Sequence, residues 1–414
     1  MKPLKITLLA LAASVMFSSA ADFRTWTSLK GETIEAQLTT YEKGNVSLTT
    51  KEAKIVKLKV ADLSLAEKQY LIEFGKGDKE LLYKSTPAVP EKSFRKPKDF
   101  LRKLEQTMTL GEGSDAQFDL YESAHYVYAV SKGIKPNGIA ETAEACWHGM
   151  AFQHYEFREN WGTTRQLIVL PDGEDLYKAI GKHEVQVLAK AGHREYAERV
   201  SATWDRTGAN RMTVPSSEVD TLKLKPRAII FNVREKKNFR KAFNSFQTHN
   251  ITSNLFSEQV GGVSSISGNG YFALSTGHAF YKEIQLTKKT ETNLLSNDYA
   301  EGVGSKAGFK DGTSWAKTLQ KMVKKGDLKP NLLATLGIKS ASDLSPEKLV
   351  TIYSLSYYLQ STQKRIAAYA KLARQINTSD QIPAPSELAK IFGFDSLEAM
   401  EKDWIEFIKS RNFK

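Results

Sequence analysis

The sequence predicts an α+β protein with two domains, a small β-rich domain and a larger α+β domain whose C-terminal half is helical. Three features of the chain predict this fold class. Short segments between residues 23 and 60 alternate apolar and polar residues, as strands do. Residues 84–99 lack periodicity and contain three prolines, which is typical of an extended linker. Beyond Thr313 the apolar spacing is almost entirely helical. We assign residues 22–75 to the first domain, 76–98 to the linker and 99–414 to the second domain.

The N-terminal 21 residues have the pattern of a signal peptide. Lys2 and Lys5 give a positive start, residues 6–17 are apolar, and small residues follow at 18–21. The apolar run is too short to anchor the chain across a bilayer. No later apolar stretch approaches membrane-spanning length. We therefore expect an exported protein, periplasmic or secreted, with no transmembrane segment in the mature chain.

Composition excludes several classes of protein. The 414 residues are 41% hydrophobic and 26% charged, which is typical of a globular chain. The formal charge is +12, but lysine and arginine are scattered among acidic residues, so we expect no nucleic-acid binding. The single cysteine, Cys146, excludes a disulfide framework and any zinc module built from cysteines. Cys146 is either buried or a site of intermolecular pairing.

The first domain is expected to be a small barrel. Its expected strands are residues 23–28, 33–41, 46–50 and 55–60, separated by turn signals. Ser64 and Glu67 form a capping box that opens a helix through Phe74. Four or five short strands followed by a helix predict an SH3-like barrel.

The same segment resembles the Sla-one homology domain. The resemblance is carried by Arg24-x-Trp26, Gly31-x-x-Ile34-x-Ala36-x-Leu38, Val46-x-Leu48, Leu58-x-Val60 and Tyr70-Leu71. In endocytic adaptors that domain binds a short peptide motif. The resemblance thus implies a protein- or peptide-binding module, and we assign no binding residues to it.

The second domain is expected to begin with mixed strands and helices. The expected strands are residues 118–121, 126–130, 166–170 and 228–232, and a helix is expected over 139–157. Residues 239–285 are expected to be helical on both sides of a Gly/Ser loop at 261–270. In the helical half, Ser345 and Pro346 mark one helix start, and Asp395 with Glu398 is expected to cap the last helix.

Four segments of this domain resemble the peptidase MA-like, or gluzincin, metallopeptidases of exported bacterial proteins. They are residues 248–256, 272–281, 314–359 and 392–404. In that family two histidines one helical turn apart, in H-E-x-x-H, bind zinc, and the intervening glutamate activates water. A glutamate on a following helix is the third ligand. The resemblance implies a gluzincin-like α+β domain over most of 99–414.

The residues at the corresponding positions are mostly uncharged. The first histidine falls on His249, the base on Asn250, the second histidine on Ser253 and the third ligand on Thr276. An amide cannot accept the proton, and hydroxyl groups are poor zinc ligands. His278 is a possible auxiliary residue, but two positions along a helix it points away from Thr276. We therefore predict no catalytic residue, no metal ligand and no cofactor.

The resulting prediction is an exported, non-catalytic protein that binds a protein or peptide through the barrel, the degenerate peptidase cleft, or both. One alternative is an active zinc peptidase that binds metal through His249 or His278. A second is a structural protein of the cell envelope. The ligand and the oligomeric state stay open.

Overall fold

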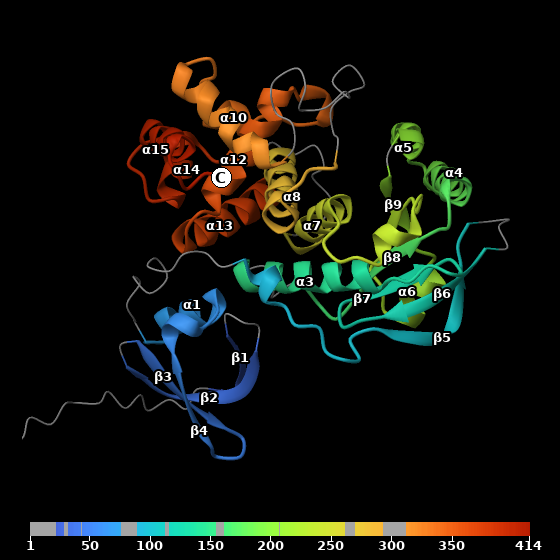
Figure 1. Ribbon diagram of the computed structural model, residues 1–414, viewed down its shortest axis with the longest axis horizontal. Helices are drawn as coiled ribbons and strands as arrows, with labels where there is room; N and C mark the ends of the chain where they lie inside the picture. The colour runs from blue at the N-terminus through green and yellow to red at the C-terminus, as the bar shows by residue number, and fades with distance from the viewer. Residues whose placement is uncertain are drawn as a thin grey trace, which may run out of the picture. The chain divides into compact units, whose positions relative to one another are not determined.

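The chain divides into two compact units, Met1–Leu82 and Tyr83–Lys414. The computed structural model (Figure 1) describes residues 22–28, 32–42, 44–75, 89–111, 116–154, 161–206, 208–260, 270–292 and 312–414. The division falls within the segment expected to be a linker. The expected signal peptide lies outside the described residues, as do residues 76–88 of that linker.

The first unit is an antiparallel meander. Its strands are β1 (Arg24–Thr27), β2 (Thr33–Glu42), β3 (Asn45–Thr50) and β4 (Ile55–Lys59), in that order across the sheet. Alternate residues face a core that contains Trp26, Ala36 and Leu48. The four strands predicted from alternation are therefore confirmed to within two residues at each end.

The sheet of the first unit is open, and no closed barrel is found in its described residues. β4 ends in a 3-10 turn at Val60–Asp62, so the chain leaves the strand conformation before it can pair along β1. A single bridge, from Ser28 to Leu63, connects the two ends of the sheet. The closed barrel expected from the strand count is therefore not observed, because short strands and an early turn leave too little backbone to complete the ladder.

Helix α1 (Leu65–Gly75) packs on this sheet and begins where the capping box predicts. The backbone N–H of Glu67 donates to Ser64 Oγ at 3.2 Å, which satisfies one free donor of the first turn. The carboxylate of Glu67 accepts from the backbone N–H of Thr27 at 3.3 Å and lies 2.9 Å from the Arg24 guanidinium. The residue therefore also ties α1 to β1.

The second unit contains a six-stranded mixed sheet. Its strands are β5 (Arg102–Thr109), β6 (Gln117–Glu122), β7 (Tyr126–Val130), β8 (Gln166–Leu170), β9 (Ala209–Thr213) and β10 (Arg227–Phe231). The order across the sheet is β5-β6-β7-β8-β10-β9, in which β7, β8 and β10 are parallel and β9 is antiparallel to β10. Four of these strands are predicted from the sequence, whereas β5 and β9 are not.

Helices cover both faces of this sheet (Figure 1). One face packs on α4 (Glu174–Lys190), α5 (Arg194–Arg206) and α6 (Ser216–Leu222). The other face packs on α3 (Asn137–Gln153) and α7 (Ser245–Val260). Every residue of β7 and β8 is consequently buried, as expected for parallel strands covered on both sides. Cys146 lies buried on α3, and burial raises the pKa of its thiol.

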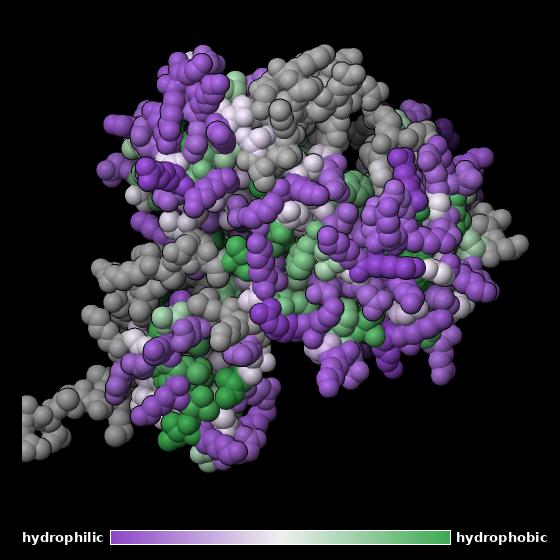
Figure 2. All heavy atoms as spheres, viewed as in Figure 1, coloured by the Kyte–Doolittle hydropathy of each residue, from purple (hydrophilic) through white to green (hydrophobic). Residues whose placement is uncertain are grey.

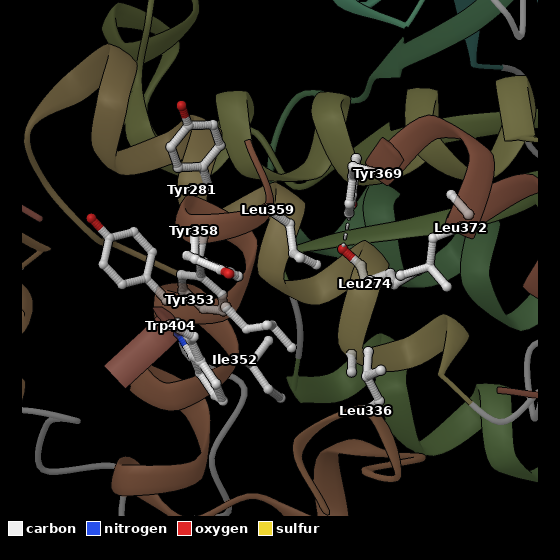
Figure 3. Packing of buried hydrophobic residues seen from close by; sticks show 14 of the residues in the cluster. Leu274, Tyr281, Leu336, Ile352, Tyr353, Tyr358, Leu359, Tyr369, Leu372 and Trp404 are labelled. Carbon is white, nitrogen blue, oxygen red and sulfur yellow. Dashed lines mark hydrogen bonds between the residues drawn. The ribbon is translucent and has the colours of Figure 1, made fainter. Parts of the chain in front are cut away.

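The C-terminal half is helical, as predicted. It comprises α8 (Tyr271–Thr287), α10 (Gly312–Lys325), α11 (Leu332–Leu336), α12 (Pro346–Leu359), α13 (Gln363–Ser379), α14 (Pro385–Ile391) and α15 (Leu397–Lys409). Their shared core is rich in aromatic and leucine side chains (Figure 3). Within it the Tyr369 hydroxyl donates to the Leu274 carbonyl at 3.2 Å, which joins α13 to α8. Among the described residues, no helix has the length and apolarity needed to cross a membrane.

The predicted helix caps are right at one site and wrong at another. Ser345 Oγ accepts from the backbone N–H of Lys348 at 3.3 Å, with Pro346 in the first helical turn of α12. At the last helix the capping residue is Ser396, whose Oγ accepts from Ala399 at 3.2 Å, and not Asp395. Ser396 is the last extended residue before α15, and only a residue in that conformation places its side chain near the first free N–H groups.

The last part of the expected linker is folded into the second unit. Pro90–Ser93 forms a 3-10 turn, and Glu91 is 1% exposed. Its carboxylate pairs with Lys282 of α8. A Cβ at Gly149 of α3 would lie 2.2 Å from Glu91, so glycine is needed for this close approach. The sequence predicts an extended linker here, because the segment lacks local periodicity. Its folded position is instead fixed by the buried ion pair between Glu91 and Lys282.

Candidate functional site

The first expected zinc ligand, His249, is buried on α7 and bonded to a carboxylate. Its Nδ1 lies 2.9 Å from Oε2 of Glu283 on α8. The other oxygen of Glu283 accepts from the backbone N–H of Glu291 at 2.8 Å. The imidazole also meets the Phe280 ring edge-to-face, with 4.4 Å between centroids. Both oxygens of Glu283 are thus engaged within the protein, and the pair holds α7 against α8.

Glu283 is a residue that the sequence analysis missed. It follows Thr276, the expected third-ligand position, by seven residues, which is about two helical turns. It is the only glutamate of α8. A carboxylate bonded to Nδ1 of a histidine is the usual support behind a histidine ligand. A search along the same helix face, and not only at the motif position, could have found it.

Asn250 and Ser253 lie together at a cleft beside α7. This α7–β9 cleft has a volume of about 220 Å³ and is lined by Ala209, Asn210, Arg211, Ile229, Asn250, Ser253 and Asn254. The Asn250 amide donates to the Phe246 carbonyl at 2.8 Å within its own helix. Positions three and four apart share a helix face, so Asn250, Ser253 and Asn254 form one polar row. The residues expected at the base and second-ligand positions therefore line a cavity.

Thr276 and His278 are buried in α8 and do not join His249. The His278 ring packs near His154 and Tyr369, with centroids 5.6 and 6.3 Å away. Burial, reinforced by the charge of Lys282, lowers the pKa of His154 to about 3. The same causes hold the pKa of His278 well below its usual value. Both imidazoles are therefore neutral in the folded chain, and His278 belongs to an aromatic core.

The donor set around His249 does not fit zinc. A zinc site needs three or four ligands that carry lone pairs on nitrogen, sulfur or oxygen. His249 and Glu283 supply two groups and are bonded to each other. The neighbouring side chains at the expected positions are an amide and two hydroxyls. Within the described ranges, no group of three or more His, Cys, Asp or Glu residues could hold a metal ion.

Comparison with protein-family models, with curated proteins and with solved structures found no match.

Arg211 gives the α7–β9 cleft its charge. It lies on β9 opposite Ile229 of β10, and therefore on the face of the sheet that α7 covers. It is partly buried, and no ion pair joins it to another residue in the described part of the chain. The cleft thus combines one uncompensated guanidinium with neutral amides and a hydroxyl. Such a lining can bind a carboxylate and hydrogen-bond a peptide, but it offers no general base at the position of Asn250.

Proposed function

We propose that the second unit binds an extended peptide in the α7–β9 cleft without cleaving it. The observation that carries the proposal is Arg211, a partly buried cation beside Asn250 and Ser253. A peptidase of the resembled family would keep a base and a zinc ligand at those two positions. Here the cleft has a cation suited to a peptide carboxylate and uncharged hydrogen-bonding groups.

The sheet edge beside the cleft supports binding of an extended backbone. β9 is at the end of the strand order and pairs only with β10 among the described strands. Its outer edge is only partly open, because the backbone N–H of Thr213 already donates to Glu184 Oε2 at 2.8 Å, so an added strand would pair near Arg211 in the middle of β9. Peptide binding by strand addition takes its affinity from such main-chain hydrogen bonds and its specificity from adjacent pockets. Arg211 and the polar row of α7 would provide that specificity.

The loss of ionisable groups is consistent with a binding role. Burying a glutamate and two histidines in a cleft without metal would cost desolvation free energy. Burying neutral amides and hydroxyls costs less. The His249–Glu283 pair keeps α7 and α8 together. The frame of a gluzincin-like domain can therefore persist as a binding fold without its catalytic groups.

We further propose that the first unit is a protein-binding module of the Sla-one homology type, and that the protein is exported. Figure 2 shows apolar residues on the visible surface of this unit. The large apolar side chains that are most exposed in the described chain are Phe23, at 46%, and Ile55, at 65%. Arg24 lies over the Tyr70 ring, 3.9 Å from its centroid, and Glu67 fixes its guanidinium. These features suit a small recognition surface.

The test of peptide binding is the variant Arg211→Ala. Peptides are selected from a displayed random library on the purified full chain, and the Kd of the strongest is measured by fluorescence anisotropy. Loss of a charge-assisted hydrogen bond to a carboxylate is expected to weaken binding by about tenfold. Arg194→Ala, an exposed arginine at the start of α5, is the matched control and should leave Kd unchanged.

Equal affinity of the wild type and Arg211→Ala for carboxylate-containing peptides would contradict the proposal. Mass spectrometry of the incubated peptides tests the enzymatic alternative in the same samples. Cleavage that requires zinc and is lost in His249→Ala would establish a peptidase.

A further inference from the structure

A second cavity lies in the second unit, at the starts of β7 and β8 and between α3 and α7. It has a volume of about 380 Å³, larger than the α7–β9 cleft. Its walls include His125, Tyr126, Trp147, Trp161 and Gln166. The volume is in the range of pockets that enclose small organic molecules. We call it the α3–α7 cavity.

One wall of this cavity is a histidine held by a buried carboxylate. Glu144 of α3 accepts from the Ser123 hydroxyl at 2.6 Å and from the His125 backbone N–H at 2.8 Å. His125 Nδ1 lies 2.7 Å from the second oxygen of Glu144. Burial raises the pKa of Glu144, but hydrogen bonds and the charge of His125 outweigh it and hold that pKa below its usual value. The carboxylate is therefore ionised.

This bond fixes the orientation of the His125 ring. Nδ1–H donates to Glu144, so Nε2 is the ring nitrogen left to bond a ligand. Trp147 stacks on the same ring, with 3.4 Å between centroids and 11° between planes. The side chain is nevertheless 34% exposed. His125 is thus a rigid, accessible hydrogen-bonding group at the cavity wall.

The remaining charges of the wall cancel in pairs. Arg165 lies 2.6 Å from Glu122, and Lys225 lies 3.3 Å from Glu258. These pairs leave no unmatched cation or anion among the described lining residues, in contrast to Arg211 in the other cleft. The chemistry of the wall therefore favours a ligand without net charge.

Four of the lining residues also have a buried polar atom that lacks a hydrogen-bond partner in the described chain. They are Tyr126 Oη, Trp161 Nε1, Gln166 Oε1 and Asn254 Nδ2. Each belongs to a side chain that is at least nine-tenths buried. An unpaired buried donor or acceptor is destabilising, so such atoms are expected to have partners. Because the set contains both donors and acceptors, a ligand that satisfies them must supply both.

We propose that the α3–α7 cavity binds a neutral saccharide. A sugar offers hydroxyl groups that both donate and accept, together with C–H faces that pack against aromatic side chains. One sugar hydroxyl bonds to Nε2 of His125, and others pair with the amide and indole groups of the wall. This site shares Asn254 with the α7–β9 cleft, but the proposal does not depend on peptide binding there.

The test uses the purified full chain titrated with maltose, cellobiose and di-N-acetylchitobiose. Binding is measured by calorimetry and by tryptophan fluorescence, to which Trp147 and Trp161 contribute. At least one of these probes is expected to bind with a Kd of about 1 mM or tighter. The variant His125→Asn should weaken that binding by about tenfold, because it removes the hydrogen bond of Nε2 to the ligand.

Asparagine is chosen because its amide N–H can occupy the place of Nδ1–H and keep the bond to Glu144. Thermal unfolding of the variant reports whether that bond and the fold are retained. His193→Asn, at an exposed position between α4 and α5, is the matched control and should bind as the wild type does. Absence of binding by all the probes would overturn the proposal. Saccharide binding that His125→Asn leaves unchanged would also overturn it.

Discussion

Replacing Lys282 by methionine is expected to lower the free energy of unfolding of the second unit by about 3–5 kcal/mol. The Lys282 ammonium donates to Glu91 and to Gln153, each at 2.5 Å. Its side chain is 3% exposed and that of Glu91 is 1% exposed. Methionine keeps most of the side-chain length but leaves the Glu91 carboxylate buried without a cation. Removing one partner of a buried pair is far more destabilising than removing both.

This effect is measured by urea unfolding of the full chain, with the circular dichroism of the helices as the signal. Lys178→Met is the matched control, because Lys178 pairs with Glu174 at the surface and such pairs contribute at most about 1 kcal/mol. The double variant Lys282→Met with Glu91→Gln should recover part of the loss, since no charge is left buried. A single variant as stable as the control would show that Glu91 and Lys282 are not a buried ion pair.

In the six-stranded sheet the sequence predicts the four inner strands, and two of them, β7 and β8, bury their side chains on both faces. β7 and β8 are short apolar runs, and both strands span the predicted residues. β5 and β9 are polar strands at the two edges of the sheet, and their own residues carry little hydrophobic pattern. Their conformation depends on pairing with β6 and β10. The residue pattern within a single strand does not contain that information. The missed strand β9 is also the one that forms the proposed peptide edge.

Side-chain partners were less predictable than the elements that carry them. Glu122 and His125 are only three residues apart in the sequence. In the fold they separate: Glu122 pairs with Arg165, whereas His125 pairs with Glu144 from α3. Likewise His249 is placed on the expected helix, but its partner Glu283 depends on how α7 packs along α8. These choices are made by tertiary packing, which residue spacing does not determine.

Replacing Glu144 by glutamine is expected to lower the free energy of unfolding by about 2–4 kcal/mol at neutral pH. The buried carboxylate accepts from the Ser123 hydroxyl and from both the backbone and the ring of His125. A glutamine amide offers one acceptor oxygen and turns N–H groups toward at least one of these donors. Part of the network is therefore left unpaired inside the protein. Glu141→Gln, on the same helix but in a more exposed pair with Lys96, should change stability by at most about 1 kcal/mol.

The effect of Glu144→Gln is also expected to depend on pH. The folded-state pKa of Glu144 lies below its ordinary value of 4.5, so the carboxylate contributes stability that is fully present above that value. As the pH falls from 4.5 through the lower folded-state pKa, the native carboxylate takes up a proton and this contribution is lost. The stability difference between wild type and Glu144→Gln should therefore shrink in acid, when urea unfolding is measured from pH 7 downward. A difference that does not shrink as the pH falls below 4.5 would show that Glu144 is not an ionised acceptor, and the bond that orients His125 at the proposed saccharide site would lose its physical basis.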